Sequence, residues 1–331
     1  MSETLSMDSV READGPEQDL DLVVEQVETV ADEVVAVTLR RADGEALPAW
    51  SPGAHLDVRL GPDIVRQYSL CGNPDDRDRW RIAVLREVNG RGGSERVHAL
   101  RSGDAVAGRG PRNNFKLDPA PRYLFIAGGI GITPILAMIT EAERAGARWQ
   151  LLYGGRTRSS MAFREELSLE YPDRVTTHPE DESGLLDLRE ALGTPIVDTL
   201  VYCCGPEPLL AAVEAACVPW PENALRIERF TPKVIDPDVT SADTAIEVEF
   251  RASGITLRVA ACSSILSAAE EAGLPVVSSC QEGICGTCET AVVEGEPDHR
   301  DSVLSPAEQA SGEVMMICCS WAKSSRLVLD L

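Results

Sequence analysis

Alternating apolar and polar positions dominate the chain from residue 20 to about residue 117. The runs LDLVVEQVETVADEVVAVTLRRA, HLDVRLG, VRQYSLCG and RWRIAVLREV share this period of two, and Gly, Pro, Asn and Asp separate them. Short strands bounded by regular turn residues are typical of an antiparallel β-barrel. The sequence therefore predicts a barrel as its first folded domain.

The pattern changes near Pro121. Apolar runs such as RYLFIAGG, RWQLLYGG and TLVYCC now alternate with segments of helical period, among them TPILAMITEAERAGA and SMAFREELSLEYP. We expect the second of these helices to stop at Tyr171 and Pro172, because proline cannot continue a helix. Strands that alternate with helices predict a parallel α/β sheet.

A second change of pattern follows residue 230. The stretch TPKVIDPDVTSADT has no periodicity and is rich in Pro, Asp, Ser and Thr, which predicts a linker. Beyond it, IEVEFRASGITLRVA predicts a hairpin and SSILSAAEEAGL a capped helix. The predicted organisation is a disordered acidic tail over residues 1–18, a β-barrel over 19–118, an α/β domain over 119–232, a linker over 233–244 and a third domain over 245–331.

Length and charge narrow the functional classes. A chain of 331 residues suggests more than one domain, and its net charge of −23 argues against nucleic-acid binding, which needs a basic surface. The charge leaves solubility or docking on a basic partner open. No apolar run reaches 18 residues and the acidic N-terminus has no apolar signal region, so we expect a cytoplasmic protein without membrane contact.

Ten cysteines in such a chain suggest thiols that act as ligands, catalysts or core residues in a reducing compartment. Cys280, Cys285 and Cys288 in SSCQEGICGTCET follow the C-x4-C-x2-C spacing of plant-type 2Fe-2S proteins, which needs a distant fourth cysteine. MMICCSWAK offers Cys318, with 29 residues between it and Cys288, and Cys319, which we expect to pack on the opposite face of the same strand. A zinc site, a disulfide or a redox switch are the alternatives, although zinc usually takes paired C-x2-C or Cys/His ligands.

Two glycine-rich turns follow predicted strands of the α/β region. In GGIGITP, Gly129 and Gly131 fit the G-x-G part of a dinucleotide fingerprint, but Pro134 replaces the third glycine. In YCCGPEP, residues 203–206 lie at the carboxyl end of another strand, where ligands bind in open α/β sheets, and the two adjacent cysteines should face opposite sides. Together the turns predict a nicotinamide dinucleotide site, with a purely structural glycine turn as the alternative.

Two motifs in the barrel region suit a flavin nucleotide. RQYSL, residues 66–70, offers an arginine for a phosphate, a tyrosine for a flat ring and a serine for a ring heteroatom. RGGS, residues 91–94, offers backbone N–H groups, a cation and a hydroxyl for a phosphate. Each motif alone is compatible with an ordinary strand or loop, and their joint presence beside a nucleotide domain favours a flavin.

The motifs, in this order, resemble the phthalate dioxygenase reductase family of the ferredoxin–NADP reductase-like superfamily. The resemblance extends from Leu20 to Leu331 and is carried by RQYSL, GRGGS, GRGPRNNFKLD, AGGIGITP, YCCGP, SSCQEGICGTC, GEPDHRDSVLS and AKSSRLVLDL. It implies an FMN-binding β-barrel, an NAD-binding α/β domain and a 2Fe-2S ferredoxin domain of β-grasp fold. It also implies FMN rather than FAD, because the family houses no adenylate half.

The resemblance assigns candidate site residues. For FMN and NADH it implies Arg66, Gln67, Tyr68, Ser69, Val84, Arg91, Gly92, Gly93, Ser94, Gly128, Gly129, Gly131, Thr133, Cys204, Gly205, Pro206 and Phe230. For the cluster it implies Cys280, Cys285, Cys288 and Cys318. Ser69, near the reactive edge of the flavin, and Phe230, which covers the ring, receive the catalytic roles.

The implied function is transfer of electrons from NADH through FMN and a 2Fe-2S cluster to a partner oxygenase. The resemblance suggests a Rieske non-haem iron oxygenase that hydroxylates or demethylates an aromatic compound as the acceptor. We expect the reductase itself to be a monomer. The alternatives are a haem monooxygenase as acceptor, a flavoprotein with a non-redox metal-binding module, and a thiol redox sensor. Two departures are Trp321 in place of the family's arginine and the pair Arg156 and Arg158, which leaves NADPH open as donor.

Overall fold

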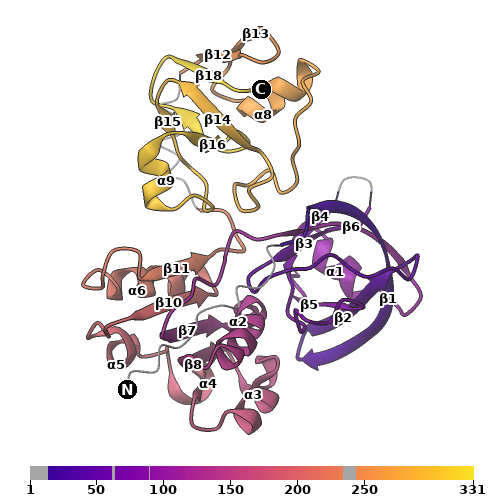
Figure 1. The fold of residues 1–331 in the computed structure, drawn as a ribbon, viewed down its shortest axis with the longest axis vertical. Helices are drawn as coiled ribbons and strands as arrows, with labels where there is room; N and C mark the ends of the chain where they lie inside the picture. The colour runs from indigo at the N-terminus through magenta and orange to yellow at the C-terminus, as the bar shows by residue number, and fades with distance from the viewer. Residues whose placement is uncertain (1–13, 62–63, 89, 234–243) are drawn as a thin grey trace, which may run out of the picture. The chain divides into compact units, whose positions relative to one another are not determined.

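The computed structural model describes residues 14–61, 64–88, 90–233 and 244–331, and Figure 1 shows its elements. The chain forms two compact units, Met1–Ile227 and Glu228–Leu331. Within the described ranges, no helix is long and apolar enough to cross a membrane. The predicted linker falls on residues 233–244, of which 234–243 lie outside the described residues.

The first sheet of unit 1 contains six antiparallel strands in the order β4-β3-β6-β1-β2-β5. Their bounds are β1 Gln18–Ala31, β2 Val34–Arg41, β3 His55–Arg59, β4 Val65–Ser69, β5 Trp80–Leu85 and β6 Ala105–Arg112. A bridge between Leu70 and Ile82 joins the two ends of this order. The alternation seen in the sequence places Leu22, Val37 and Trp80 on the inner face of the sheet, where they form one buried core. The short helix α1, Gly93–His98, contributes Val97 to the same core.

The predicted acidic tail is wrong in its last residues. Asp14 Oδ1 accepts hydrogen bonds from the Ser51 N–H (2.6 Å) and the Ser51 hydroxyl (2.7 Å), and the Gly15 N–H donates to the Ala49 carbonyl. Glu17 pairs with Arg109 at 2.7 Å, and β1 begins at Gln18. The carboxylates of Asp14 and Glu17 thus have partners in the loop before β3 and on β6. Residues 1–13 of the predicted tail lie outside the described residues.

The second sheet of unit 1 has the order β11-β10-β7-β8-β9, and the last four of these strands run parallel. The strands are β7 Arg122–Gly128, β8 Arg148–Gly155, β9 Val175–Pro179, β10 Thr199–Cys204 and β11 Leu225–Glu228. The helices are α2 Ile132–Arg144, α3 Arg164–Glu170, α4 Glu180–Ser183, α5 Leu188–Leu192 and α6 Glu207–Ala216, with 3₁₀ turns η1 Gly129–Gly131 and η2 Arg158–Ser160. As predicted, α3 ends before Tyr171 and Pro172.

The two sheets of unit 1 share a hydrophobic core. One cluster contains Val34 and Ala83 of the first sheet together with Phe125 and Tyr153 of the second, and Cys204 belongs to it as well. Cys203 lies in a different cluster with Ile126 and Leu210. The predicted opposite orientation of the two adjacent cysteines is confirmed, and the buried surface between the sheets makes them one compact unit.

Unit 2 contains a five-stranded mixed sheet in the order β13-β12-β18-β14-β16 and a two-stranded sheet of β15 and β17. The bounds are β12 Ile246–Phe250, β13 Ile255–Val259, β14 Glu289–Glu294, β15 Pro297–Asp298, β16 Val314–Met316, β17 Trp321–Ala322, β18 Arg326–Leu329, α8 Ile265–Glu271 and α9 Pro306–Ser311. The predicted hairpin forms from β12 and β13, and β12 also pairs in parallel with β18. The predicted cap of α8 is confirmed, since the Ser264 side chain accepts the Ser267 N–H.

Candidate functional site

The four cysteines predicted as cluster ligands meet in unit 2. All four are buried, with exposed fractions of 6% for Cys280, 1% for Cys285, 6% for Cys288 and 8% for Cys318. The thiol of Cys280 hydrogen-bonds with those of Cys285 and Cys318, and Cys288 bonds with Cys318. This shared bonding lowers the pKa of Cys280 and raises that of Cys318. Four thiols from two distant segments therefore form one buried sulfur group.

The loop around these thiols has a backbone that suits a compact sulfur-rich group. Gln281, Gly283 and Gly286 all have positive φ angles, of 58°, 69° and 77°. The tight winding turns N–H groups inward: the Glu282 N–H donates to Cys280 Sγ at 3.3 Å, and the Ile284 N–H also bonds to this sulfur. These donors lower the pKa of Cys280 and favour its thiolate form. Gly283 and Gly286 thus let the loop wrap around a compact group and direct N–H groups at its sulfur atoms.

One prediction about this region is wrong. Cys318 and Cys319 follow β16 in a turn, in which the Cys319 and Ser320 N–H groups both reach the Met316 carbonyl, at 3.3 and 3.0 Å. The strand rule that sends neighbours to opposite faces does not apply there. The Cys319 thiol hydrogen-bonds to that of Cys318, so a fifth sulfur lies beside the predicted ligand set.

The arrangement of the thiols bears on which metal they fit. Among the described residues, no three His, Cys, Asp or Glu side chains are grouped as the ligands of one metal ion. A structural zinc ion needs four ligands around a single point, whereas a 2Fe-2S cluster takes two thiolates on each of its irons. The C-x4-C-x2-C spacing, a distant fourth cysteine and an N–H donor to sulfur are the features of a 2Fe-2S site.

The two predicted nucleotide turns pack directly against each other in unit 1. A Cβ atom on Gly131 would lie 2.2 Å from the Cys204 carbonyl oxygen, and one on Gly128 would lie 2.7 Å from Pro206 Cδ. A Cβ atom on Gly205 would lie 3.0 Å from Gly128 Cα. Only glycine allows this contact between two backbones, which explains the glycines in both motifs.

The sheet order puts these turns at the place where parallel sheets bind ligands. From β7 the chain continues outward through β8 and β9 on one side, and β10 lies on the other side of β7. The order of strands therefore reverses between β7 and β10, and both glycine turns follow the carboxyl ends of these two strands. Gly129, with a φ of 53° and open space where a Cβ would be, begins η1, and buried Thr133 donates its hydroxyl to the Ile130 carbonyl.

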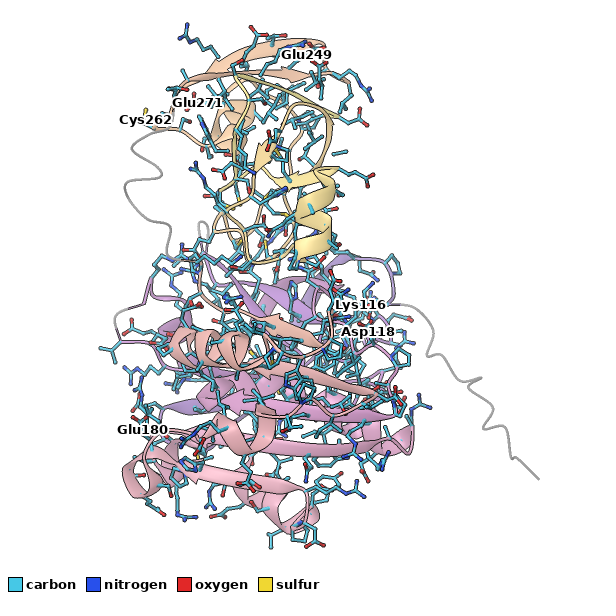
Figure 2. All side chains as sticks on the ribbon, turned by 90° about the vertical axis from the view of Figure 1, so that its left-hand side faces the viewer. Lys116, Asp118, Glu180, Glu249, Cys262 and Glu271 are labelled. Atoms are coloured by element: carbon cyan, nitrogen blue, oxygen red, sulfur yellow. The ribbon has the colours of Figure 1, made fainter. Side chains whose placement is uncertain are left out.

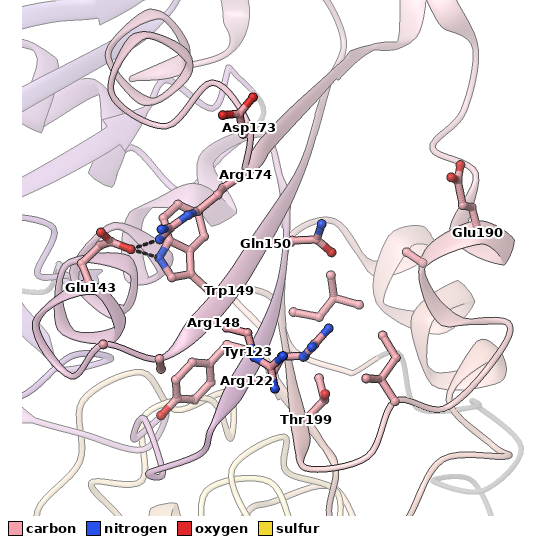
Figure 3. A pocket seen from close by; sticks show the side chains of 15 residues that line it. Arg122, Tyr123, Glu143, Arg148, Trp149, Gln150, Asp173, Arg174, Glu190 and Thr199 are labelled. Carbon is pink, nitrogen blue, oxygen red and sulfur yellow. Dashed lines mark hydrogen bonds and ion pairs between the residues drawn. The ribbon is translucent and has the colours of Figure 1, made fainter. Parts of the chain in front are cut away.

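A cavity of about 460 Å³ lies at the other end of the same sheet. Its lining includes Arg122, Arg148 and Thr199, the first residues of β7, β8 and β10. Figure 3 shows Glu143 at its wall, where it accepts hydrogen bonds from Trp149 Nε1 (2.6 Å) and from Arg174. Because the cavity is at the amino ends of the strands, it is separate from the nucleotide turns.

The two predicted flavin motifs also come together. On β4, the Arg66 guanidinium donates to the Arg91 carbonyl at 3.3 Å, so the arginine of RQYSL reaches the RGGS loop. A Cβ atom on Gly93 would lie 2.6 Å from Arg66 Cγ, and Gly92 adopts a left-handed φ of 79°. The Ser94 hydroxyl accepts the Glu87 N–H at 3.0 Å. A cation, a glycine backbone and a hydroxyl thus gather around the beginning of α1.

The remaining flavin candidates differ in exposure. Ser69 is buried at 5%, and Tyr68 is half-buried, with a pKa that burial raises to about 12, so its hydroxyl stays neutral. Val84 is a buried core residue of β5, and its carbonyl oxygen lies 3.0 Å from His98 Nε2. Phe230 follows β11 and is 38% exposed, so it can offer a ring to a ligand, and its role stays a prediction.

The sequence interpretation missed a buried charged pair beneath the flavin motif. Asp57 on β3, only 2% exposed, accepts hydrogen bonds from Gln67 Nε2 (3.0 Å) and Arg112 Nη2 (2.8 Å). This contact holds the Gln67 side chain of β4 against β3, and Asp57 is itself held by Arg112 of β6. An aspartate within the apolar run HLDVRLG was the available signal, because a buried acid needs a polar or charged partner.

Comparisons with known proteins agree with this division of the chain. The model of the 2Fe-2S iron-sulfur cluster binding domain matches residues 248–323, which include all four buried thiols, and the model of the oxidoreductase NAD-binding domain matches residues 125–215, which include both glycine turns. The phenoxybenzoate dioxygenase subunit beta of Ectopseudomonas oleovorans is 43% identical over 304 residues, 91% of this chain and 94% of the relative. The chain belongs to the phthalate dioxygenase reductase-like family.

Solved structures of the family match over nearly the whole chain. Phthalate dioxygenase reductase, described as a modular structure for electron transfer from pyridine nucleotides to [2Fe-2S], is 36% identical, covers 95% of this chain and 98% of its own, and gives a TM-score of 0.69. An intact type IV self-sufficient cytochrome P450 monooxygenase is 44% identical with a TM-score of 0.89 and also covers 95% of this chain. This chain spans only 41% of that protein's length. The ferredoxin reductase-like fold, with NAD-binding and 2Fe-2S domains, is thereby confirmed.

Proposed function

We propose that this chain is the NADH-dependent reductase component of an oxygenase system, with FMN and a 2Fe-2S cluster as its resident groups. The observation that carries the proposal is the buried group of four thiols in a chain that also holds two interlocking nucleotide turns. Its relatives include reductase subunits of oxygenases that are similar over almost their entire length. We further propose that the first sheet closes as the flavin barrel and that unit 2 is a β-grasp ferredoxin domain.

In this proposal each motif has a binding task. Arg66, the backbone of the glycine pair 92–93 and Ser94 bind the FMN phosphate, since a guanidinium and N–H groups suit a phosphate. Tyr68 and Phe230 pack on the flavin ring and exclude water from it, and Ser69 donates a hydrogen bond near the reactive edge. Gln67, held by Asp57, and the buried Val84 complete the flavin contacts.

The nucleotide turns and the thiol loop have corresponding tasks. Gly128 to Thr133 and Cys204 to Pro206 leave room for a dinucleotide backbone at the switch point between β7 and β10. Cys280, Cys285, Cys288 and Cys318 bind the two irons, and the loop N–H groups stabilise charge on sulfur. FMN held by these residues would supply chemistry that joins two-electron hydride transfer to one-electron transfer, and a 2Fe-2S cluster held by the four thiolates would supply one-electron transfer.

A Rieske non-haem iron oxygenase is the proposed acceptor. The named relatives of this chain include a dioxygenase subunit and a dioxygenase reductase. A haem monooxygenase is the second candidate, because a self-sufficient cytochrome P450 contains a region 44% identical to this chain. When the purified chain is combined with an oxygenase of either class, NADH-dependent turnover of the oxygenase substrate should occur with only one of the two classes.

The cofactor content tests the proposal directly. The purified protein should be red-brown, should contain iron and labile sulfide, and should release FMN on denaturation. Addition of NADH under anaerobic conditions should bleach both the flavin and the charge-transfer bands. A plain yellow protein with zinc and no iron would contradict the cluster, and release of FAD would contradict the FMN assignment.

A further inference from the structure

The turn after β8 carries two arginines beside the nucleotide turns. Gly154 on β8 pairs in register with Gly128 on β7, so Arg156 and Arg158 follow the neighbouring strand at the carboxyl edge of the same sheet. In dinucleotide-binding folds this neighbouring edge receives the adenosine ribose. An acidic residue there binds the 2′-hydroxyl of NADH, whereas an arginine accommodates the 2′-phosphate of NADPH. Read as sequence, the turn offers only the arginines.

The structure supplies the missing acid from another segment. Arg158 Nε and Nη2 donate to the two carboxylate oxygens of Glu182, at 2.5 and 2.6 Å. Glu182 lies on α4, which follows β9, and β9 runs parallel to β8. The Asp181 N–H also donates to the Arg156 carbonyl at 3.1 Å, which ties the backbone of α4 to the arginine turn.

The ion pair is well oriented but exposed. The Thr157 and Ser160 side chains form a reciprocal cap on η2, which fixes the backbone that carries Arg158. The Arg158 and Glu182 side chains are 52% and 42% exposed. An ion pair with this exposure contributes little to folding. Its main consequence is that the guanidinium edge of Arg158 is occupied and its charge balanced.

We propose that Glu182 is a specificity-determining residue that makes this chain select NADH over NADPH. Glu182 holds the two N–H donors of Arg158 that a 2′-phosphate would need. Its carboxylate can accept a hydrogen bond from a ribose 2′-hydroxyl but repels the nearly doubly charged phosphate. The inference rests on the proposed function, because it concerns the nucleotide that the same site oxidises.

The test is Glu182→Gln in the full-length protein with its cofactors bound. We measure kcat/KM for NADH and NADPH with a small quinone as electron acceptor. The ratio of NADPH to NADH efficiency should rise about tenfold, as expected for one altered contact at a specificity pocket. In the same variant, 2′,5′-ADP should become a stronger inhibitor relative to 5′-ADP than it is for the wild type. Adding Arg158→Ala to Glu182→Gln should remove the gain, because it deletes the freed guanidinium.

Glu180→Gln is the matched control. Glu180, labelled in Figure 2, lies on the same short helix as Glu182. Its replacement removes one negative charge from that helix but leaves the ion pair of Arg158 and Glu182 intact. Its nucleotide ratio should equal that of the wild type. An unchanged ratio in Glu182→Gln or an equal rise in Glu180→Gln would overturn the inference alone. A wild-type preference for NADPH would overturn the inference and the choice of NADH as donor in the proposed function. A wild-type protein that oxidises neither nucleotide would overturn the proposed function as well.

Discussion

Single residues in the thiol loop are held to narrow conformations. Gly283 has a φ of 69°, and a Cβ atom there would lie 2.4 Å from Cys319 Sγ and 3.0 Å from Asp301 Cα. The buried Asp301 carboxylate accepts the Val303 and Leu304 N–H groups, so it cannot move aside without losing both bonds. The loop geometry thus depends on contacts with a segment that lies almost 20 residues further along the chain.

The adjacent cysteines give the first prediction. Cys318→Ser should lower bound iron from about two atoms per chain to less than half of that, because one of the two irons loses a thiolate. Cys319→Ser should keep the full iron content, since the proposed ligand set does not include Cys319 and a serine hydroxyl can replace its weak contacts with the Met316 carbonyl and the Ser320 hydroxyl. Iron and labile sulfide analysis of both purified variants checks this. The opposite result would make Cys319 the fourth ligand.

Arg66 gives a second prediction at this scale. Arg66→Lys keeps the charge but loses the forked donor group, and the variant should bind FMN about 10- to 100-fold more weakly, as expected when a charge-assisted hydrogen bond is lost. Arg59→Lys on the neighbouring β3 is the control, because Arg59 pairs with exposed Asp19 instead. Fluorescence titration of the flavin-free proteins with FMN measures both affinities. Equal binding by the two variants would remove Arg66 from the phosphate site.

At the scale of elements, two turns from separate strands form one surface. Both glycine motifs are visible in the sequence, but their contact results from the placement of β10 beside β7. Gly131 and Gly205 follow strands about 75 residues apart in the chain, and each leaves space for the backbone of the other turn. The turns are therefore structurally coupled.

Gly131→Ala tests this coupling. A Cβ atom 2.2 Å from the Cys204 carbonyl oxygen forces the turns apart, which should reduce the stability of unit 1 by about 1–3 kcal/mol, the usual range for overpacking. The KM for NADH should rise because the phosphate-facing backbone shifts. Gly154→Ala on β8 is the control, since its nearest neighbour would be Leu186 Cδ1 at 3.7 Å. Thermal unfolding and NADH kinetics on both variants decide the outcome, and equal behaviour would contradict a tight interlock.

The sequence predicts an element or a contact well when the pattern that specifies it lies within one short segment of the chain. Period-two alternation and capping residues are local, so the strands of the first sheet and the cap at Ser264 were predictable. Contacts between distant segments leave no local signal, so the partners of Asp57 and Glu182 were not predicted. The orientation of Cys319 was predicted wrongly because a strand was assumed where the chain turns.

At the scale of the whole molecule, negative charge is concentrated where electrons are proposed to leave. Residues 245–331 contain 13 Asp and Glu against 5 Lys and Arg, a net charge of −8. Glu247, Glu249 and Glu294 all pair with Arg326. Glu289, directly after Cys288, instead has other acids near it: burial, together with Glu308 and Asp301, raises its pKa. Glu289 and Glu308 thus place negative charge near the thiol loop, as expected for a surface that attracts a basic partner.

This distribution predicts how salt acts on electron transfer. Raising the ionic strength from about 0.02 M to about 0.5 M should slow NADH-dependent reduction of the partner oxygenase about tenfold or more, because the attraction is screened. Reduction of a small neutral quinone should hardly change, since no charged surface is involved. Replacing Glu289 and Glu308 by Gln should weaken the salt dependence, whereas Glu249→Gln, which alters the group around Arg326, should leave it as in the wild type. Stopped-flow kinetics at several salt concentrations measures all three proteins. A rate to the oxygenase that is independent of salt would show that docking does not depend on the acidic face of unit 2.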